Sequence, residues 1–276
     1  MINPFDNFSW VVDKFIAASE YPDNEEKLKF LKDQGIDSIV TLSEKKIDDS
    51  LLKKYKFRNL YLPIKDFDIP KYSDVKKFLT WMNLMEKWEI PTLIHCDAGI
   101  GRTGTMLAIF FISKGKSPKE SIDLVKNIRN YNLESLKQEK FIYEISDILR
   151  DFYYPEDEIF YIFHKTVETL RKECPWDRKQ TKESLLKYFE EEFNELKDAI
   201  KKNDTDNTVE ELGDVLLEIM LLIIIGEENN EFKVNDILNR VIEKLVKRHP
   251  HVFKDEVIKT AEEVEDRWEE LKKNSI

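Results

Sequence analysis

The sequence predicts two domains, an α/β domain followed by an all-α domain. Up to about residue 150, short β-branched or apolar runs alternate with helical patterns, and from about residue 159 only helical periodicity is found. A length of 276 residues is enough for two domains, and 41% hydrophobic residues are enough to build a core. We therefore expect domains at residues 1–152 and 158–276.

The first half is expected to form a layered α/β fold. Strand-like runs cover residues 37–42, 60–64 and 92–95, and helical patterns cover residues 24–34, 73–88, 102–114, 118–130 and 136–150. A short connector with a break at Pro155 follows and separates the two patterns.

The second half is expected to be helical throughout. Helical patterns lie near residues 159–172, 181–201, 207–227, 234–248 and 256–273. Thr181 is a candidate N-cap residue, and the polar stretch from Asn203 to Asn207 predicts a turn between two helices.

The net charge of −11 is concentrated in the second half. Residues 1–150 hold 24 Lys/Arg and 23 Asp/Glu, whereas the remainder holds 20 and 32. Such an acidic half does not attract a nucleic-acid polymer. The longest apolar run, from Leu216 to Ile225 with Glu218 inside it, is too short to cross a membrane, and no signal peptide is visible. We expect a cytoplasmic protein in which Cys96 and Cys174 are free thiols.

The stretch from Ile94 to Gly104 has the composition of an anion-binding loop. It lies between an apolar strand and an apolar helix and holds three of the seven glycines. Glycines allow backbone N–H groups to approach an anion closely, and the helix N-terminus adds to the attraction. Arg102, six residues after Cys96, supplies a planar fork for two phosphate oxygens. The residues expected to bind phosphate are Asp97, Ala98, Gly99, Ile100, Gly101 and Arg102.

Cys96 is the candidate nucleophile of this loop. The positive surroundings are expected to keep it as a thiolate at neutral pH. We interpret His95 as a residue that organises the loop, and we expect the Thr103 hydroxyl to donate to the sulfur and help it leave in a second step. The alternative is that Cys96 is a small buried apolar residue at a strand end. The coincidence of strand, His, Cys, Gly, Arg and Thr-Gly favours catalysis.

The pattern His95-Cys-x-x-Gly-x-x-Arg102-Thr103 resembles the signature loop of the protein tyrosine and dual-specificity phosphatases. Phe8-Ser-Trp10, the run from Ile16 to Ser19 and the run from Leu62 to Phe67 resemble the small prokaryotic and archaeal members, so that the similarity covers about residues 5–150. The resemblance implies that Cys96 attacks phosphorus, an acid protonates the leaving oxygen, and water hydrolyses the cysteinyl phosphate without a metal. The implied substrate is a phosphorylated protein or a small phosphomonoester.

The resemblance places the acid on a loop about thirty residues before the cysteine. Asp66 and Asp68 both lie there, and the family pattern Pro-Ile-x-Asp-Phe-x-x-Pro favours Asp66. Asp68 is the alternative acid, unless it is an ordinary turn residue before Pro70. Gln138 falls where the family often has a glutamine near the hydrolytic water, although a surface helix residue is an equally good interpretation.

Two pairs of carboxylates in the second half share helix faces. Glu192 and Glu195 are three residues apart, as are Glu211 and Asp214, and a turn joins the two helices. Antiparallel packing of these helices brings four carboxylates together, and a cation such as Mg²⁺ relieves their repulsion. The alternative is an ordinary solvated face, because Glu-rich helices are common.

The succession of motifs in this half resembles the MazG nucleoside triphosphate pyrophosphohydrolases over about residues 160–275. The motifs are Cys174-Pro-Trp-Asp-x-x-Gln-Thr181, Glu191-Glu-x-x-Glu195, Glu210-Glu-Leu-Gly-Asp214, Lys247-Arg-His-Pro-His-Val-Phe253 and Arg267-Trp-Glu-Glu-Leu-Lys272. The resemblance implies an all-α, usually dimeric domain that hydrolyses nucleoside triphosphates to monophosphate and pyrophosphate with Mg²⁺. One departure is Arg267, where the family commonly has Asn.

The same resemblance assigns roles by position. The implied metal ligands are Glu192, Glu195, Glu211 and Asp214, and the implied nucleotide-binding residues are Trp176, Glu191, Lys244, Arg248, Trp268 and Lys272. Core packing is an equally good interpretation of each tryptophan. The whole chain is thus expected to be a bifunctional hydrolase that forms a homodimer through its helical half. The alternative is a phosphatase whose helical half serves only for dimerisation or nucleotide sensing.

Overall fold

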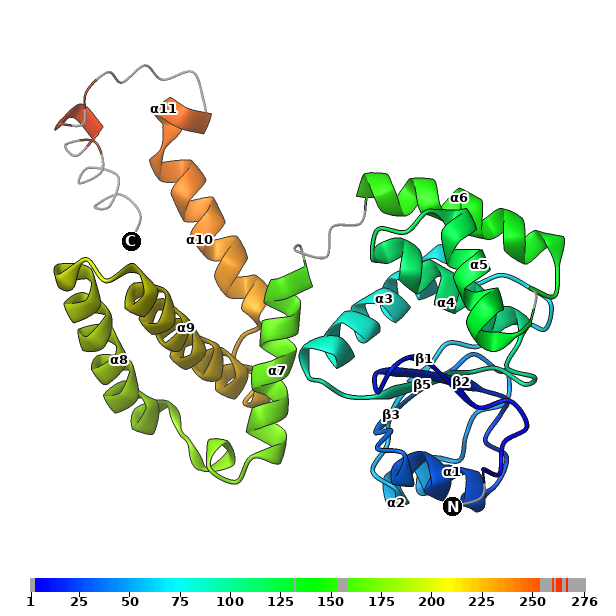
Figure 1. Cartoon of the computed structure of the whole chain (residues 1–276). Helices are drawn as coiled ribbons and strands as arrows, with labels where there is room; N and C mark the ends of the chain where they lie inside the picture. Colours follow the sequence, from blue (N-terminus) through cyan, green and yellow to red (C-terminus); the bar gives the residue numbers. More distant parts are fainter. Residues whose placement is uncertain are drawn as a thin grey trace. The chain divides into compact units, whose positions relative to one another are not determined.

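The computed structural model describes residues 3–131, 133–152, 158–253, 260, 262–264 and 267. The chain forms two compact units, Met1–Ile159 and Phe160–Ile276 (Figure 1). The first combines a sheet with helices and the described part of the second is helical, so the predicted fold class is confirmed.

A five-stranded sheet lies at the centre of the first unit. Its spatial order is β1 (Ser9–Val12), β2 (Ile16–Ser19), β5 (Thr92–His95), β3 (Ser38–Thr41) and β4 (Arg58–Tyr61). β1 is antiparallel to β2, and the other neighbours are parallel. Parallel strands of this kind are buried on both faces, which explains why β2, β3 and β5 are buried at every residue.

Helices cover both faces of this sheet (Figure 1). α1 (Glu25–Asp33) and α2 (Asp49–Lys54) lie on one face, and α3 (Tyr72–Lys87), α4 (Gly101–Ser113), α5 (Pro118–Arg129) and α6 (Leu136–Phe152) lie on the other. Successive residues of β5 point to opposite faces: Leu93 packs in the core beneath α1 and Ile94 in the larger core beneath α4. Every residue of α4 from Gly101 to Ile112 is buried.

The described part of the second unit is helical up to residue 253. Its segments are α7 (Ile159–Glu173), the short 3₁₀ turn η2 (Asp177–Lys179), α8 (Lys182–Lys202), α9 (Thr205–Glu228), α10 (Val234–Arg248) and α11 (Pro250–Phe253). The predicted N-cap at Thr181 is confirmed, since its side chain accepts from the Ser184 N–H. The predicted turn is also present: Asn203 ends α8 in the left-handed conformation and Asp204 caps α9.

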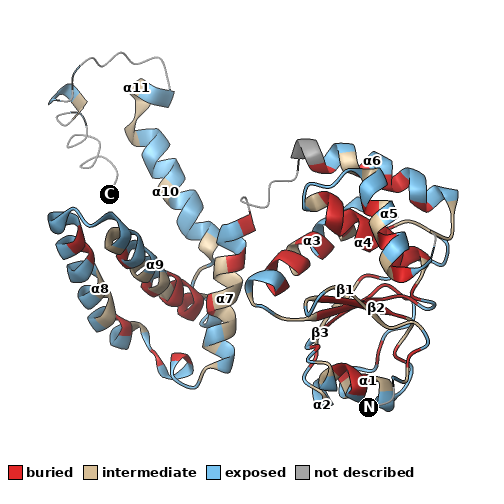
Figure 2. Cartoon of the chain, viewed as in Figure 1, coloured by how far each residue is buried: buried red, intermediate tan, exposed pale blue. Residues whose placement is uncertain are grey.

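α8 and α9 form an antiparallel hairpin whose core lies at the α7 end. Val167 of α7, Leu185 of α8 and Met220, Leu221 and Ile224 of α9 are almost completely buried. α10 has no buried residue at all (Figure 2). No described helix is both long enough and apolar enough to cross a membrane.

The sequence did not predict β1, β2, α2 or the short segments η2 and α11. β1 and β2 have four residues each, and such short runs carry little periodicity. The strand expected at residues 60–64 ends at Tyr61, before Pro63, which has no N–H for a ladder. Most of the helix expected at residues 256–273 lies outside the described residues.

Candidate active sites

The first site is built on the loop that joins β5 to α4. The backbone of Gly99 is left-handed, with φ +71°, and a Cβ added there would lie 2.3 Å from the Ser19 carbonyl oxygen. Only glycine satisfies both conditions, so the loop curls tightly against the end of β2. This curl turns the loop back over the start of α4, at the sheet edge where α/β proteins bind their ligands.

Cys96 and Arg102 lie at the two ends of this loop and are both buried. The Cys96 Sγ accepts a 3.2 Å hydrogen bond from the Gly99 N–H. The Arg102 guanidinium donates to the Ile64 carbonyl at 2.9 Å and to Asp97 at 2.6 Å, and it forms an ion pair with Asp66 at 2.8 Å. Burial alone would lower the pKa of Arg102, but the bond to Asp97 and the negative surroundings raise it, so the guanidinium remains charged.

His95 is completely buried beneath the loop. Burial is the main cause that lowers its pKa to about 4, so the imidazole is neutral at pH 7. Its Nδ1 lies 3.1 Å from the Cys96 carbonyl oxygen, which requires that this nitrogen carries the proton, and its Nε2 lies 3.0 Å from Thr41 Oγ1. The ring thus ties the carbonyl of the cysteine to β3 and organises the loop.

Thr103 is also fully buried, one residue after Arg102. Its Oγ1 has no hydrogen-bond partner among the described residues. The hydrogen bond that we expected from this hydroxyl to the sulfur is therefore not formed in this structure.

Arg129, the last residue of α5, is a structural residue that the sequence analysis missed. Its guanidinium donates to the carbonyl oxygens of Asn7 and Ala18 at 2.7 and 2.6 Å, to Ser9 Oγ at 2.7 Å and to the Gly99 carbonyl at 3.0 Å. Burial lowers its pKa. A single arginine at a helix end belongs to no recognisable sequence motif. Only the folded structure therefore shows that Arg129 binds the loop through the Gly99 carbonyl.

The two candidate acids differ in their partners. Asp66 is half exposed and reaches the Arg102 guanidinium. Asp68 points the other way, pairs with Lys137 and accepts the Ile69 N–H. The hydrogen bond from Lys137 is the main cause that lowers the pKa of Asp68. Phe67 between them has φ +58°, an unfavourable conformation for a bulky residue that turns the two carboxylates apart.

Gln138 is fully buried and is not a surface residue of α6. Its Nε2 donates to the Asp68 carbonyl oxygen at 3.3 Å, and its Oε1 accepts the Glu134 N–H at 3.2 Å. Glu134, which the sequence analysis did not consider, accepts the Gly101 N–H at 3.0 Å. Gln138 therefore connects the acid loop to the segment that contacts the start of α4.

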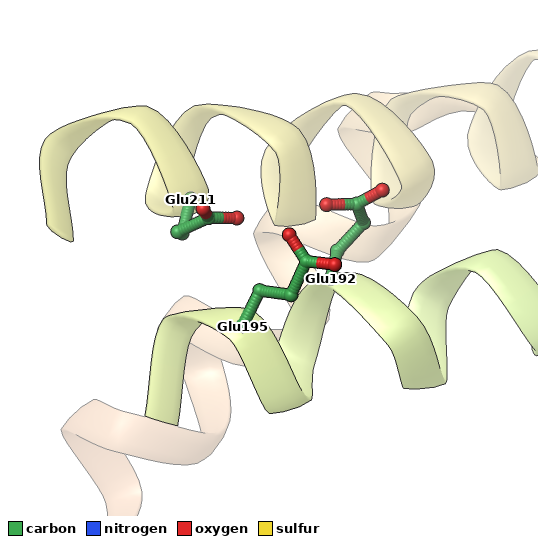
Figure 3. Close-up of side chains that lie close together, drawn as sticks. All are labelled: Glu192, Glu195 and Glu211. Carbon is green, nitrogen blue, oxygen red and sulfur yellow. The ribbon is translucent and has the colours of Figure 1, made fainter. Parts of the chain in front are cut away.

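The second site lies on the hairpin of α8 and α9. Glu192 and Glu195 of α8 and Glu211 of α9 point toward one another (Figure 3), and one oxygen from each lies within 4.8 Å of the other two. Desolvation and then the neighbouring carboxylates raise the pKa of Glu192 and of Glu211. Glu211 is buried, and its Oε2 has no hydrogen-bond partner among the described residues. Hard oxygen donors with an unmet charge fit a divalent cation.

Asp214 and Glu218 extend this acidic region along α9. Asp214 is half-buried and does not join the group of three, but its charge contributes to the raised pKa of Glu192. Glu218 is only 7% exposed, and desolvation, followed by the charges of Glu192, Asp177 and Asp214, raises its pKa. In the sequence, Glu218 stands out as the one charged residue in the apolar run from Leu216 to Ile225. We considered that run only as a possible membrane span and did not predict a role for Glu218.

Comparison with known proteins assigns the two halves. Residues 5–142 match the sequence profile of the Swiss Army Knife protein, DSP-PTPase phosphatase domain, which covers half of the chain. The chain belongs to this phosphatase family. Residues 180–253 match the MazG nucleotide pyrophosphohydrolase domain, so the helical half carries a MazG domain. Both are hydrolase families, as the motifs predicted.

Individual relatives resemble parts of the chain. The uncharacterized protein YabN of Bacillus subtilis (strain 168) is 38% identical over 54% of this chain and 28% of its own length. The nucleoside triphosphate pyrophosphohydrolase of Escherichia coli (strain K12) is 40% identical over 36% of this chain and 38% of its own. The chain thus spans less than half of these relatives. The crystal structure of Tk-PTP in the active form is 25% identical, with a TM-score of 0.48 over 51% of this chain and 97% of that one.

The structure describes four of the six residues expected to bind nucleotide in the MazG domain, and these four lie on three different segments. Trp176 is 49% exposed and packs edge-on against Tyr188, with the ring centroids 5.6 Å apart. Glu191 is exposed beside Lys187. Lys244 is exposed on α10, where it lines a cavity of about 540 Å³ that none of the four predicted metal ligands lines. Arg248 is half-buried at the end of α10. Trp268 and Lys272 lie outside the described residues.

Proposed function

We propose that the chain is a bifunctional hydrolase with domains at residues 1–152 and 158–276. The first cleaves phosphomonoesters through a cysteinyl phosphate on Cys96. The second hydrolyses nucleoside triphosphates to monophosphate and pyrophosphate with Mg²⁺. The observation that carries the first activity is the convergence of a buried thiol, a loop N–H and a buried guanidinium on one loop.

The proposed phosphatase reaction has two balanced steps. The Cys96 thiolate attacks phosphorus, an S–P bond forms, the P–O bond breaks, and Asp66 gives its proton to the leaving oxygen. Arg102 and the loop N–H groups hold the remaining phosphate oxygens. In the second step Asp66 accepts a proton from water, the water oxygen bonds to phosphorus, and the S–P bond breaks to regenerate the thiolate.

Asp66 is the better acid of the two candidates. Its carboxylate already lies at Arg102, where the phosphoryl group is expected, whereas Asp68 is directed toward Lys137. The lowered pKa of Asp68 also works against proton donation at neutral pH, since this carboxyl gives up its proton at lower pH than usual. The substrate of this site is a phosphorylated protein or a small phosphomonoester.

The proposed pyrophosphohydrolase site uses the carboxylates of the α8–α9 hairpin. Glu192, Glu195 and Glu211 would hold Mg²⁺, with Asp214 as a fourth ligand. When bound, the ion neutralises the carboxylates and the triphosphate. The residues proposed to contact the nucleotide are Trp176, Glu191, Lys244, Arg248, Trp268 and Lys272.

We further propose that the helical domain forms a homodimer in the cytoplasm. Much of α8, α9 and α10 is exposed (Figure 2). The large apolar side chains exposed on these helices include Leu186, Phe193 and Ile200 of α8, Val209, Leu212, Leu216 and Ile219 of α9, and Ile237, Leu238, Ile242, Leu245 and Val246 of α10. Soluble monomers rarely leave so many uncovered, and a second copy supplies the matching surface. The same faces favour a second candidate function, in which the helical half only dimerises the phosphatase.

The two activities are tested by their opposite response to metal. Release of phosphate from an aryl phosphate is expected to survive a chelator and to be lost with vanadate or in Cys96→Ser. Release of pyrophosphate from nucleoside triphosphates is expected to require Mg²⁺ and to be lost in Glu192→Ala, while Cys96→Ser retains it. If no nucleoside triphosphate is hydrolysed in the presence of Mg²⁺, the helical half serves for dimerisation or nucleotide sensing instead.

A further inference from the structure

We infer that Glu134 sets the anion affinity of the phosphatase site: its carboxylate occupies an anion-binding N–H of the loop and so weakens the binding of a phosphoryl group, in inorganic phosphate as in a phosphomonoester. This inference rests on the proposed phosphatase function. It concerns a residue that takes no part in the proposed chemical steps.

The carboxylate of Glu134 lies directly on the start of α4. Its Oε2 accepts a 3.0 Å hydrogen bond from the Gly101 N–H, and a Cβ added to Gly101 would lie only 2.0 Å from that oxygen. Gly101 is the first residue of α4, so its N–H has no partner within the helix and attracts anions. Glu134 therefore takes a place in which we expect an oxygen of the bound phosphate.

Glu134 is held in this place by the first turn of α6. Its N–H donates to Gln138, which is fully buried and donates in turn to the Asp68 carbonyl oxygen. Ser135 Oγ accepts the Gln138 N–H at 3.2 Å. Because the carboxylate is tethered close to its N–H partner, it competes with free anions at a high effective concentration.

The carboxylate opposes a free anion by charge as well as by occupancy. A phosphate dianion that enters the loop meets a negative charge at contact distance and must displace it. The phosphoryl group of a phosphomonoester must displace the same charge, so its binding is weakened by a similar factor. Glu134 therefore lowers the affinity of the loop for substrate and product alike and limits inhibition by released phosphate.

The test measures anion binding to the full chain by calorimetry, with inorganic phosphate and tungstate as probes. Glu134→Gln and Glu134→Ala are compared with the wild type and with Glu144→Gln, which changes an exposed glutamate of the following helix α6. Glu134→Ala is expected to bind the two anions about tenfold more tightly, and Glu134→Gln, which loses the charge but keeps an oxygen for the Gly101 N–H, by a smaller factor. KM for p-nitrophenyl phosphate is expected to fall by a similar factor while kcat changes by less than about threefold, and the Glu144 control stays at the wild-type value.

Unchanged or weaker anion binding in both Glu134 variants, with wild-type melting temperatures, overturns the inference and leaves the phosphatase function intact. Comparison of the two variants also separates occupancy from charge, because a glutamine loses the charge but retains an oxygen that still accepts the Gly101 N–H. A wild-type chain that neither binds tungstate nor cleaves the aryl phosphate defeats the proposed function itself.

Discussion

Arg129 donates a 3.0 Å hydrogen bond to the carbonyl oxygen of Gly99, the residue whose left-handed backbone shapes the phosphate loop. The two residues are thirty positions apart in sequence. The same guanidinium donates to Ser9 Oγ of β1 and to the Ala18 carbonyl oxygen of β2. The loop is therefore held between a strand end that excludes a side chain at Gly99 and an arginine that fixes its carbonyl.

Replacement of Arg129 by Lys is expected to weaken both the fold of the first unit and phosphatase activity. An ammonium group cannot reproduce four hydrogen bonds made by one planar fork, so buried carbonyl groups lose their partner. We expect the free energy of unfolding to fall by about 3 kcal/mol. Denaturant unfolding measures this loss, and the exposed Lys119→Gln on the same helix serves as the control.

Replacement of Gly99 by Ala should abolish phosphatase activity, because the new Cβ collides with Ser19 and the backbone conformation is strained. Gly115→Ala provides a matched control: its φ is +87°, but no atom lies within 4 Å of an added Cβ. The control carries only the strain, about 1 kcal/mol, and retains activity. Equal rates of aryl phosphate hydrolysis in the two variants would contradict the proposed role of the loop.

The proton donor can be identified from the leaving group. Asp66→Asn is expected to lower kcat about 100-fold for an alkyl phosphate, whose leaving oxygen needs a proton, and much less for p-nitrophenyl phosphate. Asp68→Asn is expected to change both rates by a similar small factor, since Asp68 pairs with Lys137. If this leaving-group dependence appears in the Asp68 variant, Asp68 is the acid.

The buried His95 makes the first unit sensitive to acid. The unfolded chain protonates this histidine below its ordinary pKa of 6.5, whereas the folded protein holds it neutral down to about 4. Stability from this residue is present above pH 6.5 and is lost as the pH falls toward 4, by a total of about 3 kcal/mol. In His95→Gln, the loss of stability between pH 6.5 and 4 should be smaller than in the wild type, which thermal melts over this range measure.

Removal of one charge from the acidic cluster is expected to stabilise the metal-free protein and to abolish its stabilisation by Mg²⁺. Glu211→Gln relieves repulsion among carboxylates whose pKa values are already raised, so the melting temperature without metal should increase. The increase in melting temperature on addition of Mg²⁺ should disappear in this variant and persist in the exposed Glu190→Gln control. A Mg²⁺ response that survives in Glu211→Gln excludes this carboxylate as a ligand.

Local patterns predicted much of the fold and of both sites. The helix boundaries of α8, α9 and α10 were predicted to within about two residues, because caps, polar turns and amphipathic periodicity are local properties. The elements that were missed, β1, β2 and α2, are short and owe their existence to pairing and packing with distant segments.

The spacing of Cys96 and Arg102 and the pairing of Glu192 with Glu195 follow from the sequence alone, since six residues limit the distance between the ends of a loop and positions three apart share one face of a helix. Only the tertiary structure placed Arg129 and Glu134 on the loop, gave Gln138 its buried position and aligned Glu211 with the carboxylates of α8. Those contacts join segments separated by sixteen to seventy residues. Their geometry depends on how whole elements pack, which no local spacing determines.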